Sequence, residues 1–442
     1  MECVGDGKSM PPILSITTRG LNARATIMII RNLSGIFTGE GFVQREGRRV
    51  RDDDCSFVAG PIDIAIDDRG TISGVGRELA SPGEVIDGAG MIALPGFIDP
   101  HTHAIFSGDR STEYFMRWAG KTYLEISQAG GGIHSTVTAT AGQTSEELEA
   151  LLRLRLQNML ACGATVVEVK SGYAATAEDE LRLLRCIKRV SEDRAMPELR
   201  PSFLGLHALP RGRIESEFVD EMIAALPEVT RHELATQVDS FPEKGFFTRE
   251  SALRFSAAAK ASGLPCKVHA DELCDLGSSA AFIRAGALSI DHLQHINNEA
   301  VSLLATHPTV ATMLPATSFF VGIPYANARR LLDAGARVAL ATDFNPGTAP
   351  AFDLQLTHML AASQMKMTPA EILCASTYNA AAALGLEKTH GAIMPGRVGN
   401  ILLYSSTGAA AGLTMLQQIS ISRAKPFAVV LLGSVSEQPR HG

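Results

Sequence analysis

Two histidines one residue apart, His101 and His103, follow a largely apolar segment that begins at Leu94. Side chains two positions apart on a β-strand point to the same side, so both imidazoles face one point where the strand ends. Imidazole nitrogen is a common ligand of Zn²⁺ and other transition metals. The pair therefore indicates half of a metal site, although two ordinary surface histidines would give the same pattern.

Other polar residues end further apolar runs in the same way. His207, His269 and His292 each close a run, and Asp343 follows a fourth. In a (β/α)8 barrel the carboxyl ends of the strands meet at the face that carries the reactive groups. A buried histidine is more often a hydrogen-bonded core residue than a ligand, but chance is a poor explanation for so many strand-end residues. The pattern predicts a metal site at that face.

The natural assignment gives one metal ion the ligands His101, His103, His269 and Asp343. Three nitrogens and one carboxylate suit Zn²⁺, and they also suit iron or manganese. A bound metal ion lowers the pKa of its water to about 7 and so activates it for attack. Asp343 is then placed both to bind the metal and to accept the proton of that water.

Two further residues fit supporting roles in catalysis. His292 is interpreted as a hydrogen-bond partner of the activated water or of a developing oxyanion. Glu272 follows His269 by three residues, and a carboxylate beside the site can carry a proton to a nitrogen of the substrate. A solvated loop glutamate is the competing interpretation for Glu272, and Asp271 is the competing carboxylate.

The elements that must position these residues are short apolar runs separated by helical stretches. Their continuous apolar character is typical of parallel strands buried on both faces. Capping boxes at Thr144–Glu147 and Thr368–Glu371 predict two of the helix starts. With the run before His101, about eight strands alternate with helices, which predicts a (β/α)8 TIM-type barrel. The other predicted strands are Ala164–Lys170, Pro201–His207, Gln237–Phe241, Pro265–His269, Ser289–Leu293, Thr309–Leu314 and Arg337–Thr342.

Both ends of the chain have a different pattern, with short β-rich pieces between Gly and Asp turns. Ile62–Ile66 alternates apolar residues with Asp and Ala, which is typical of a half-buried strand. Further β-rich segments follow near the other end of the chain, at Gly399–Tyr404 and Phe427–Gly433. We predict a small β-sandwich domain built from residues 1–92 and 389–442, with the metallohydrolase barrel at residues 93–388.

Composition narrows the class of protein. The 442 residues carry a formal net charge of −7, which offers no electrostatic case for nucleic-acid binding. No apolar stretch approaches the roughly 20 residues that span a bilayer, and the segment from Met1 to Pro12 lacks the order of a signal peptide. The seven cysteines are scattered, without a Cys-x-x-Cys pair, as in a reducing compartment. We expect a cytoplasmic enzyme that acts on a small molecule, away from membranes.

These residues make the chain similar to the amidohydrolase superfamily and, within it, to the imidazolonepropionase family. The superfamily resemblance rests on the segment Pro95–His103 with His269, His292 and Asp343. The closer resemblance rests on six motifs spread over most of the chain. They are Phe106–Arg110, Ala129–Ile133, Glu168–Tyr173, Leu206–Pro210, Lys267–Glu272 and Thr342–Thr348.

The resemblance implies hydrolytic opening of the cyclic amide 4-imidazolone-5-propanoate to N-formimidoyl-L-glutamate, the third step of histidine degradation. It implies one divalent or trivalent metal ion, zinc or iron, on the four ligands named above, and a homodimer. It also implies contacts to the anionic imidazolone substrate from Arg110, Tyr173, His207, Glu272, Asn345, Gly347 and Thr348. An arginine suits the propanoate carboxylate, and a phenol can add a hydrogen bond. Tyr123 is a weaker candidate on the same wall.

Some residues depart from the family pattern, and other functions remain open. The departures are His134, Ala174, Pro242 and Gln294, and they bear on loop conformation and substrate fit because none is a proposed ligand. Lys170 lies on the second predicted strand, whereas a lysine that bridges two metals belongs on the fourth. A deaminase of a cytosine-like or guanine-like heterocycle would use the same ligands, and a catalytically silent scaffold is the alternative outside enzymes.

Overall fold

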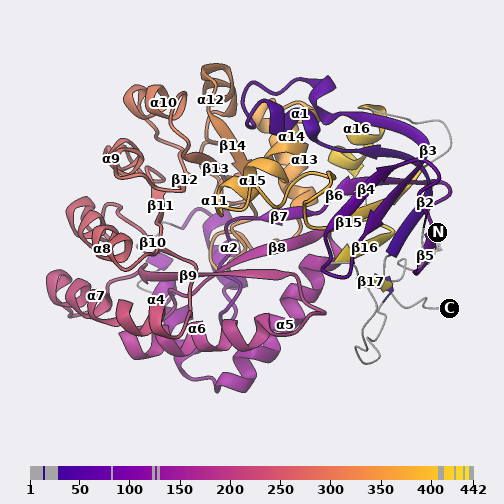
Figure 1. Ribbon diagram of the computed structural model, residues 1–442. Helices are drawn as coiled ribbons and strands as arrows, with labels where there is room; N and C mark the ends of the chain where they lie inside the picture. The colour runs from indigo at the N-terminus through magenta and orange to yellow at the C-terminus, as the bar shows by residue number, and fades with distance from the viewer. Residues whose placement is uncertain are drawn as a thin grey trace, which may run out of the picture.

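A computed structural model describes residues 13–14, 28–80, 83–121, 125–126, 130–406, 413–422, 425–431 and 434–437. Eight short parallel strands form the centre of the larger part of the molecule (Figure 1). They are β7 (Phe97–Asp99), β8 (Ala164–Lys170), β9 (Glu198–Leu206), β10 (Gln237–Ser240), β11 (Lys267–Ala270), β12 (Ser289–His292), β13 (Val310–Met313) and β14 (Arg337–Leu340). Each overlaps a strand predicted from the sequence, so the predicted TIM-type barrel is confirmed.

Hydrogen bonds divide the barrel into two four-stranded parallel sheets that meet at two seams. One sheet has the order β10-β9-β8-β7 and the other the order β11-β12-β13-β14. A parallel bridge between Val238 and Cys266 joins β10 to the residue before β11, and another joins Thr102 to Phe344. At the second seam Asp343 N donates to His101 O at 3.1 Å. Closure of the barrel thus places Asp343, three residues beyond the last strand, beside the first predicted ligand.

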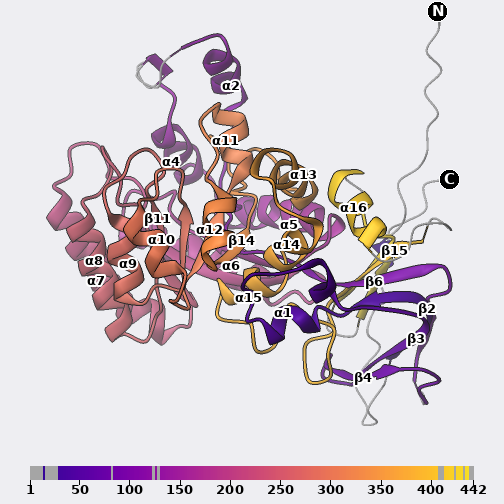
Figure 2. The ribbon, with the colours of Figure 1, turned by 90° about the horizontal axis from the view of Figure 1, so that it is seen from above.

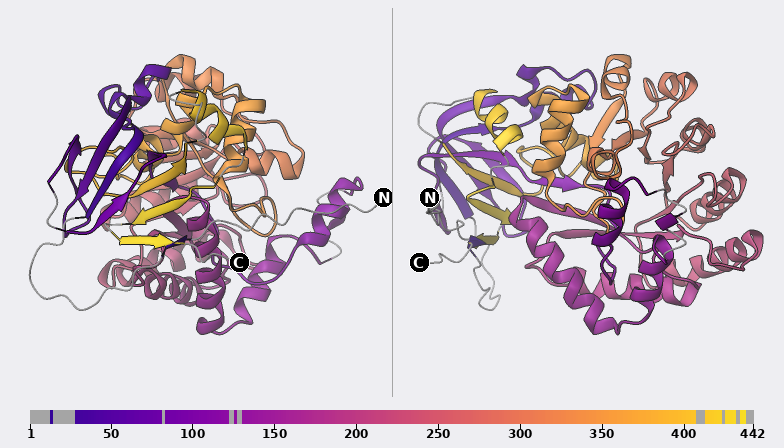
Figure 3. Two further views of the ribbon diagram at one scale, coloured as in Figure 1. Left: turned by 90° about the vertical axis from the view of Figure 1, so that its right-hand side faces the viewer. Right: turned by 180° about the vertical axis from the view of Figure 1, so that it is seen from behind.

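Helices surround the strands, as Figure 3 shows from two sides. In chain order they are α2 (Ser111–Trp118), α4 (Ile133–Ala141), α5 (Ser145–Ala161), α6 (Ala177–Ser191), α7 (Glu215–Arg231), α8 (Arg249–Ala261), α9 (Ser278–Ala285), α10 (Asn298–Leu304), α11 (Pro315–Val321), α12 (Ala328–Ala334), α13 (Leu354–Met365), α14 (Pro369–Ala375) and α15 (Tyr378–Ala382). Both predicted capping boxes are present: Thr144 caps α5 with Glu147, and Thr368 caps α14 with Glu371. None of the helices in the described parts of the chain is long and apolar enough to cross a membrane.

The two ends of the chain share one nine-stranded sheet beside the barrel (Figure 2). Its path is β1-β17-β16-β15-β6-β2-β3-β4, with β5 paired to β2. The strands are β1 (Ile13–Leu14), β2 (Met28–Phe37), β3 (Phe57–Ile66), β4 (Ile72–Gly76), β5 (Val85–Asp87), β6 (Met91–Pro95), β15 (Ile401–Ser405), β16 (Ala428–Leu431) and β17 (Ser434–Glu437). Ile30, Ile64, Ile401 and Val430 belong to a separate apolar core of this sheet. The domain boundaries at residues 92 and 388 remain predictions.

Gly96 is the one residue between the sheet and the barrel where the chain first passes from one to the other. It lies between the end of β6 and the start of β7, and its N–H donates to Asn400 O at 2.8 Å. A Cβ atom at this position would lie 2.3 Å from Thr165 Oγ1, which explains the need for glycine. The sheet is therefore joined directly to the start of the strand that leads to His101 and His103.

Candidate metal centre

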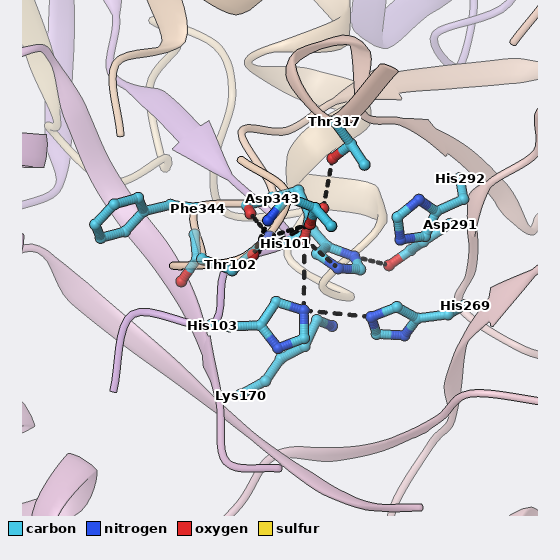
Figure 4. Close-up of polar contacts among 12 residues, drawn as sticks. His101, Thr102, His103, Lys170, His269, Asp291, His292, Thr317, Asp343 and Phe344 are labelled. Carbon is cyan, nitrogen blue, oxygen red and sulfur yellow. Dashed lines mark hydrogen bonds and ion pairs between the residues drawn. The ribbon is translucent and has the colours of Figure 1, made fainter. Parts of the chain in front are cut away.

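The four predicted ligands converge at the carboxyl ends of the barrel strands (Figure 4). His103 Nε2 lies 3.3 Å from His269 Nε2. Asp343 Oδ1 lies 3.4 Å from the Nε2 atoms of both His101 and His103. All four side chains are buried, although they come from positions up to 242 residues apart (343 − 101).

These separations fit the edges of a metal coordination shell. A tetrahedral ion with bonds of about 2.0–2.1 Å places neighbouring ligand atoms roughly 3.3–3.4 Å apart. Among the residues that the structure describes, the buried His101 Nε2 has no hydrogen-bond partner. An unpaired buried nitrogen is costly, so its orientation toward the other ligand atoms is explained by an ion between them. The donor set of three imidazoles and one carboxylate thus suits zinc or iron.

Two buried carboxylates orient the histidine ligands from behind. His101 Nδ1 donates to Asp291 Oδ2 at 2.6 Å, and His269 Nδ1 donates to Asp239 Oδ1 at 3.2 Å. Because each Nδ1 carries the donated proton, each Nε2 directs its lone pair toward the other ligands. Burial, reinforced by the charge of Lys170, lowers the pKa of both rings well below the usual range. Both histidines are therefore neutral, as metal binding requires.

Asp239 and Asp291 were not singled out in the sequence analysis. Each lies inside a short, fully buried strand, β10 and β12 respectively. Burying a carboxylate in such a strand costs free energy unless the carboxylate is paired. Its presence in an apolar run was therefore a signal, within the sequence, of a buried partner. The pairing itself joins positions far apart in the chain, so the sequence did not reveal the partner.

Asp343 is held from both sides. Its Oδ2 accepts a hydrogen bond from Thr317 Oγ1 at 2.5 Å, while Oδ1 faces His101 and His103. Burial alone would raise the pKa of Asp343, but the two histidines outweigh it and hold that pKa well below its usual range. Asp343 is therefore ionised. Thr317, at the start of α11, is a partner that the sequence analysis missed.

The backbone is strained at several positions around the site. Asp271, His292 and Asp343 have φ values of 52°, 83° and 55°, in the left-handed region that favours glycine. Each lies just beyond or at the end of a barrel strand. Such strain persists where surrounding contacts hold it and is typical of functional sites.

His292 and Glu272 border the same site. The ring centroid of His292 lies 5.2 Å from that of His269, and its Nδ1 lies 3.6 Å from Glu272 Oε1. Burial, aided by Asp343 and Glu243, raises the pKa of Glu272 despite the opposing effect of His292. A raised pKa keeps the carboxyl protonated at a higher pH, as a general acid requires.

The competing carboxylate, Asp271, has a structural role instead. Its oxygens accept from the backbone N–H groups of Leu276, Ser278 and Ser279 at 3.2–3.3 Å. These bonds fix the loop that leads into α9. Asp271 is thereby engaged by its own loop, whereas the Glu272 carboxyl faces His292.

Two predicted substrate-contact residues lie against the ligands. The ring of His207 stacks on that of His103 with centroids 4.9 Å apart, and His207 Nδ1 donates to Gly172 O at 3.0 Å. Burial, with a contribution from His103, lowers the pKa of His207 to about 3, so the ring is neutral. The ring of Tyr173 lies 5.4 Å from that of His207. Burial raises the pKa of Tyr173, so its phenol remains a donor.

Arg110 is engaged by a neighbouring glutamate. Its Nε and Nη2 donate to the two carboxylate oxygens of Glu113 at 2.9 and 2.8 Å. Glu113 Oε1 also accepts from Gly132 N at 2.9 Å. Nη1 is the remaining nitrogen of the guanidinium, and a Cβ atom on Gly347 would lie 2.0 Å from it. The arginine therefore offers one nitrogen, rather than a free fork, beside the 343–348 loop.

The amide of Asn345 is used within its own loop. Its Oδ1 accepts from the N–H groups of Gly347 and Thr348 at 2.8 and 2.7 Å, and its Nδ2 donates to Asp343 O at 2.6 Å. Asn345 thus shapes the loop that places Asp343. Contacts of Asn345, Gly347 and Thr348 with substrate remain predictions, and Tyr123 lies outside the described residues.

Comparisons with known proteins agree with this geometry. The model of the amidohydrolase family matches residues 92–418. An imidazolonepropionase of Porphyromonas gingivalis is 37% identical over 385 residues, which cover 85% of this chain and 90% of that protein. The imidazolonepropionase of Caldanaerobacter subterraneus subsp. tengcongensis is 42% identical over 349 residues, or 78% of this chain and 83% of the relative.

Solved structures share the fold at lower identity. A triazine hydrolase variant superposes with a TM-score of 0.72 and 20% identity, over 92% of this chain and 94% of that one. An adenosine deaminase from Xanthomonas campestris with bound zinc gives a TM-score of 0.69 and 16% identity, over 92% of both chains. From the family match and the extent of the likeness to its relatives, the chain belongs to the amidohydrolase family and, within it, to the imidazolonepropionase family.

Proposed function

We propose that the chain hydrolyses 4-imidazolone-5-propanoate to N-formimidoyl-L-glutamate, the third step of histidine degradation. The observation that carries this proposal is the convergence of four ligands. His103 Nε2 lies 3.3 Å from His269 Nε2, and Asp343 Oδ1 lies 3.4 Å from the Nε2 atoms of His101 and His103. Relatives named imidazolonepropionase align with most of the chain and support the choice of substrate.

The four ligands would hold a single zinc or iron ion. Such an ion, when bound, supplies a water acidic enough to ionise near neutral pH and polarises a carbonyl oxygen. Asp343 is an ionised carboxylate beside that position, and it accepts the proton of the attacking water. Thr317 donates to the second carboxylate oxygen, Oδ2, and so fixes the orientation of the Asp343 carboxylate with Oδ1 toward the histidines.

His292 and Glu272 would serve the later part of the reaction. In the described part of the chain, the buried His292 Nδ1 has no hydrogen-bond partner, so it is available to stabilise the oxygen of the tetrahedral intermediate. Glu272 lies beside it with a raised pKa. It delivers a proton to the departing ring nitrogen, after which the ring opens.

The substrate carboxylate would bind at the wall formed by Arg110 and Tyr173. Arg110 Nη1 is the guanidinium nitrogen that Glu113 does not engage. The protonated phenol of Tyr173 adds a neutral donor, and the neutral ring of His207 leaves its Nε2 for the substrate ring. This wall would hold the carboxylate of an anionic substrate beside the metal site.

We also propose a homodimer in the cytoplasm. The family resemblance supports the dimer, and the seven scattered cysteines suit a reducing compartment.

Product analysis of the purified, metal-loaded full-length protein tests the function. We expect loss of 4-imidazolone-5-propanoate, formation of N-formimidoyl-L-glutamate and no release of ammonia. A rate no greater than spontaneous decay would contradict the proposal. Ammonia release from a cytosine-like or guanine-like heterocycle would instead support the deaminase alternative. His232→Ala is a matched control for histidine variants, because His232 is exposed at the end of α7.

A further inference from the structure

Five ionisable side chains form a buried charge network beneath the metal centre. The network consists of Glu168 and Lys170 on β8, Asp239 on β10, Lys267 on β11 and Asp291 on β12, and all five side chains are fully buried. None of them takes part in the proposed reaction. Two ammonium groups face three carboxylates, so the network carries one net negative charge beneath the site for a cation.

Lys267 holds His101 at two points. Its Nζ donates to Pro100 O, the carbonyl directly before the ligand, and lies 3.4 Å from Asp291 Oδ2. That same carboxylate oxygen accepts from His101 Nδ1 at 2.6 Å. The lysine thus contacts both the backbone that leads into His101 and the group that orients its ring.

Lys170 has the corresponding relation to His269. Its Nζ lies 2.5 Å from Asp239 Oδ2, while Asp239 Oδ1 accepts from His269 Nδ1 at 3.2 Å. Glu168 connects the two halves, because its Oε2 lies 2.8 Å from Lys170 Nζ and 2.9 Å from Lys267 Nζ. Each of two metal ligands therefore rests on one carboxylate and one lysine, and one glutamate joins the lysines.

Stability is a weak explanation for this arrangement. Burying charges costs desolvation energy, and apolar residues of similar size often serve a fold as well or better. Carboxylates behind metal-binding histidines, in contrast, fix the tautomer and direction of the ring. We propose that Lys267 and Lys170 are positioning residues that fix His101 and His269 for metal binding. The inference rests on the proposed metal site.

Zinc affinity of the metal-free, full-length protein tests the inference. Competition with a chromophoric chelator gives the Kd for zinc, and the visible spectrum of bound Co²⁺ reports the ligand geometry. For Lys267→Met we expect a Kd about 10–100-fold higher than that of the parent, with an altered Co²⁺ spectrum. Lys260→Met is the matched control, because Lys260 is an exposed residue of α8. The zinc affinity of this variant is expected to stay at the parent value.

A second variant separates positioning from charge balance. Lys267→Met with Glu168→Gln removes one charge of each sign, so folding should recover if the single variant is destabilised. Weak zinc binding in the folded double variant would support the inference. A folded single or double variant with a Kd within twofold of the parent would overturn it, as would failure of both to fold. Because zinc binding involves no substrate, failure here is distinguishable from failure of the proposed ring opening.

Discussion

The metal side and the substrate side of the candidate site are held in place by different kinds of element. On the metal side, His101 and His269 are backed by buried carboxylates that belong to barrel strands. On the substrate side, Arg110, Asn345 and Gly347 lie outside the strands and contact mainly Glu113 and one another. In the proposed assignment, metal binding thus rests on rigid elements, while substrate recognition rests on loops that can vary.

Among variants that keep the metal ligands, the largest effect on activity is expected at the boundary of the two sides. Glu272→Gln keeps the size of the side chain but removes the acid, so kcat should fall about 10²–10⁴-fold, the usual contribution of a positioned general acid. Metal content should stay at the parent value because Glu272 is not a ligand. Steady-state kinetics with metal analysis checks both; an unchanged kcat would remove Glu272 from the mechanism.

A smaller effect is expected from the carboxylate behind His101. Asp291→Asn removes the acceptor charge that fixes the Nδ1 proton of His101, so zinc affinity should fall roughly 10–100-fold. Chelator competition measures the change. If affinity is unaffected while the protein is folded, the metal side does not depend on its carboxylate supports, and the contrast between the two sides fails.

The substrate side should respond through KM. Arg110→Met removes the charged donor proposed for the propanoate, and a lost charged hydrogen bond of about 1.5–3 kcal/mol raises KM roughly 10–100-fold. Zinc affinity should remain unchanged, which separates this variant from Asp291→Asn. Arg254→Met is the control, because Arg254 is an exposed arginine of α8, away from the site. A fall in metal affinity with Arg110→Met would show that the two sides are not independent.

Glu180 supports the loop that carries Tyr173, and its substitution is expected to change the free energy of unfolding with the smallest effect on activity. Its buried carboxylate accepts from Gly172 N at 2.9 and 3.0 Å, and burial raises its pKa to about 7. The folded state therefore retains a proton that the unfolded chain loses above about pH 4.5, so this residue costs stability as pH rises toward 7.

Glu180→Gln should accordingly gain about 1–3 kcal/mol of stability relative to the parent between pH 5 and pH 8. Denaturant unfolding at the two pH values measures the difference. Glu178→Gln is the matched control, because Glu178 is an exposed residue of the same helix. If the free energy of unfolding depends on pH equally in the parent and in Glu180→Gln, the proposed protonation of Glu180 beneath the Tyr173 loop is wrong.

The sequence predicted the eight strands well because buried parallel strands are short, continuous apolar runs, and their ends carry polar residues. The strand ends thereby predicted that His269 and Asp343 lie beside His101. The residues that orient these ligands were not predicted. Lys267 contacts Asp291, and Asp291 contacts His101, only in the closed barrel, and no local sequence pattern predicts such contacts. The pairing of Arg110 with Glu113 was accessible, since the two are three residues apart at the start of a helix.

Metal content measured together with turnover tests the central claim most directly. The account predicts one zinc or iron ion per parent chain and ring opening that depends on it, with both lost in His269→Ala and both retained in the His232→Ala control. A His269→Ala protein that still opens the ring of 4-imidazolone-5-propanoate at the parent rate would contradict the ligand assignment and the mechanism built on it.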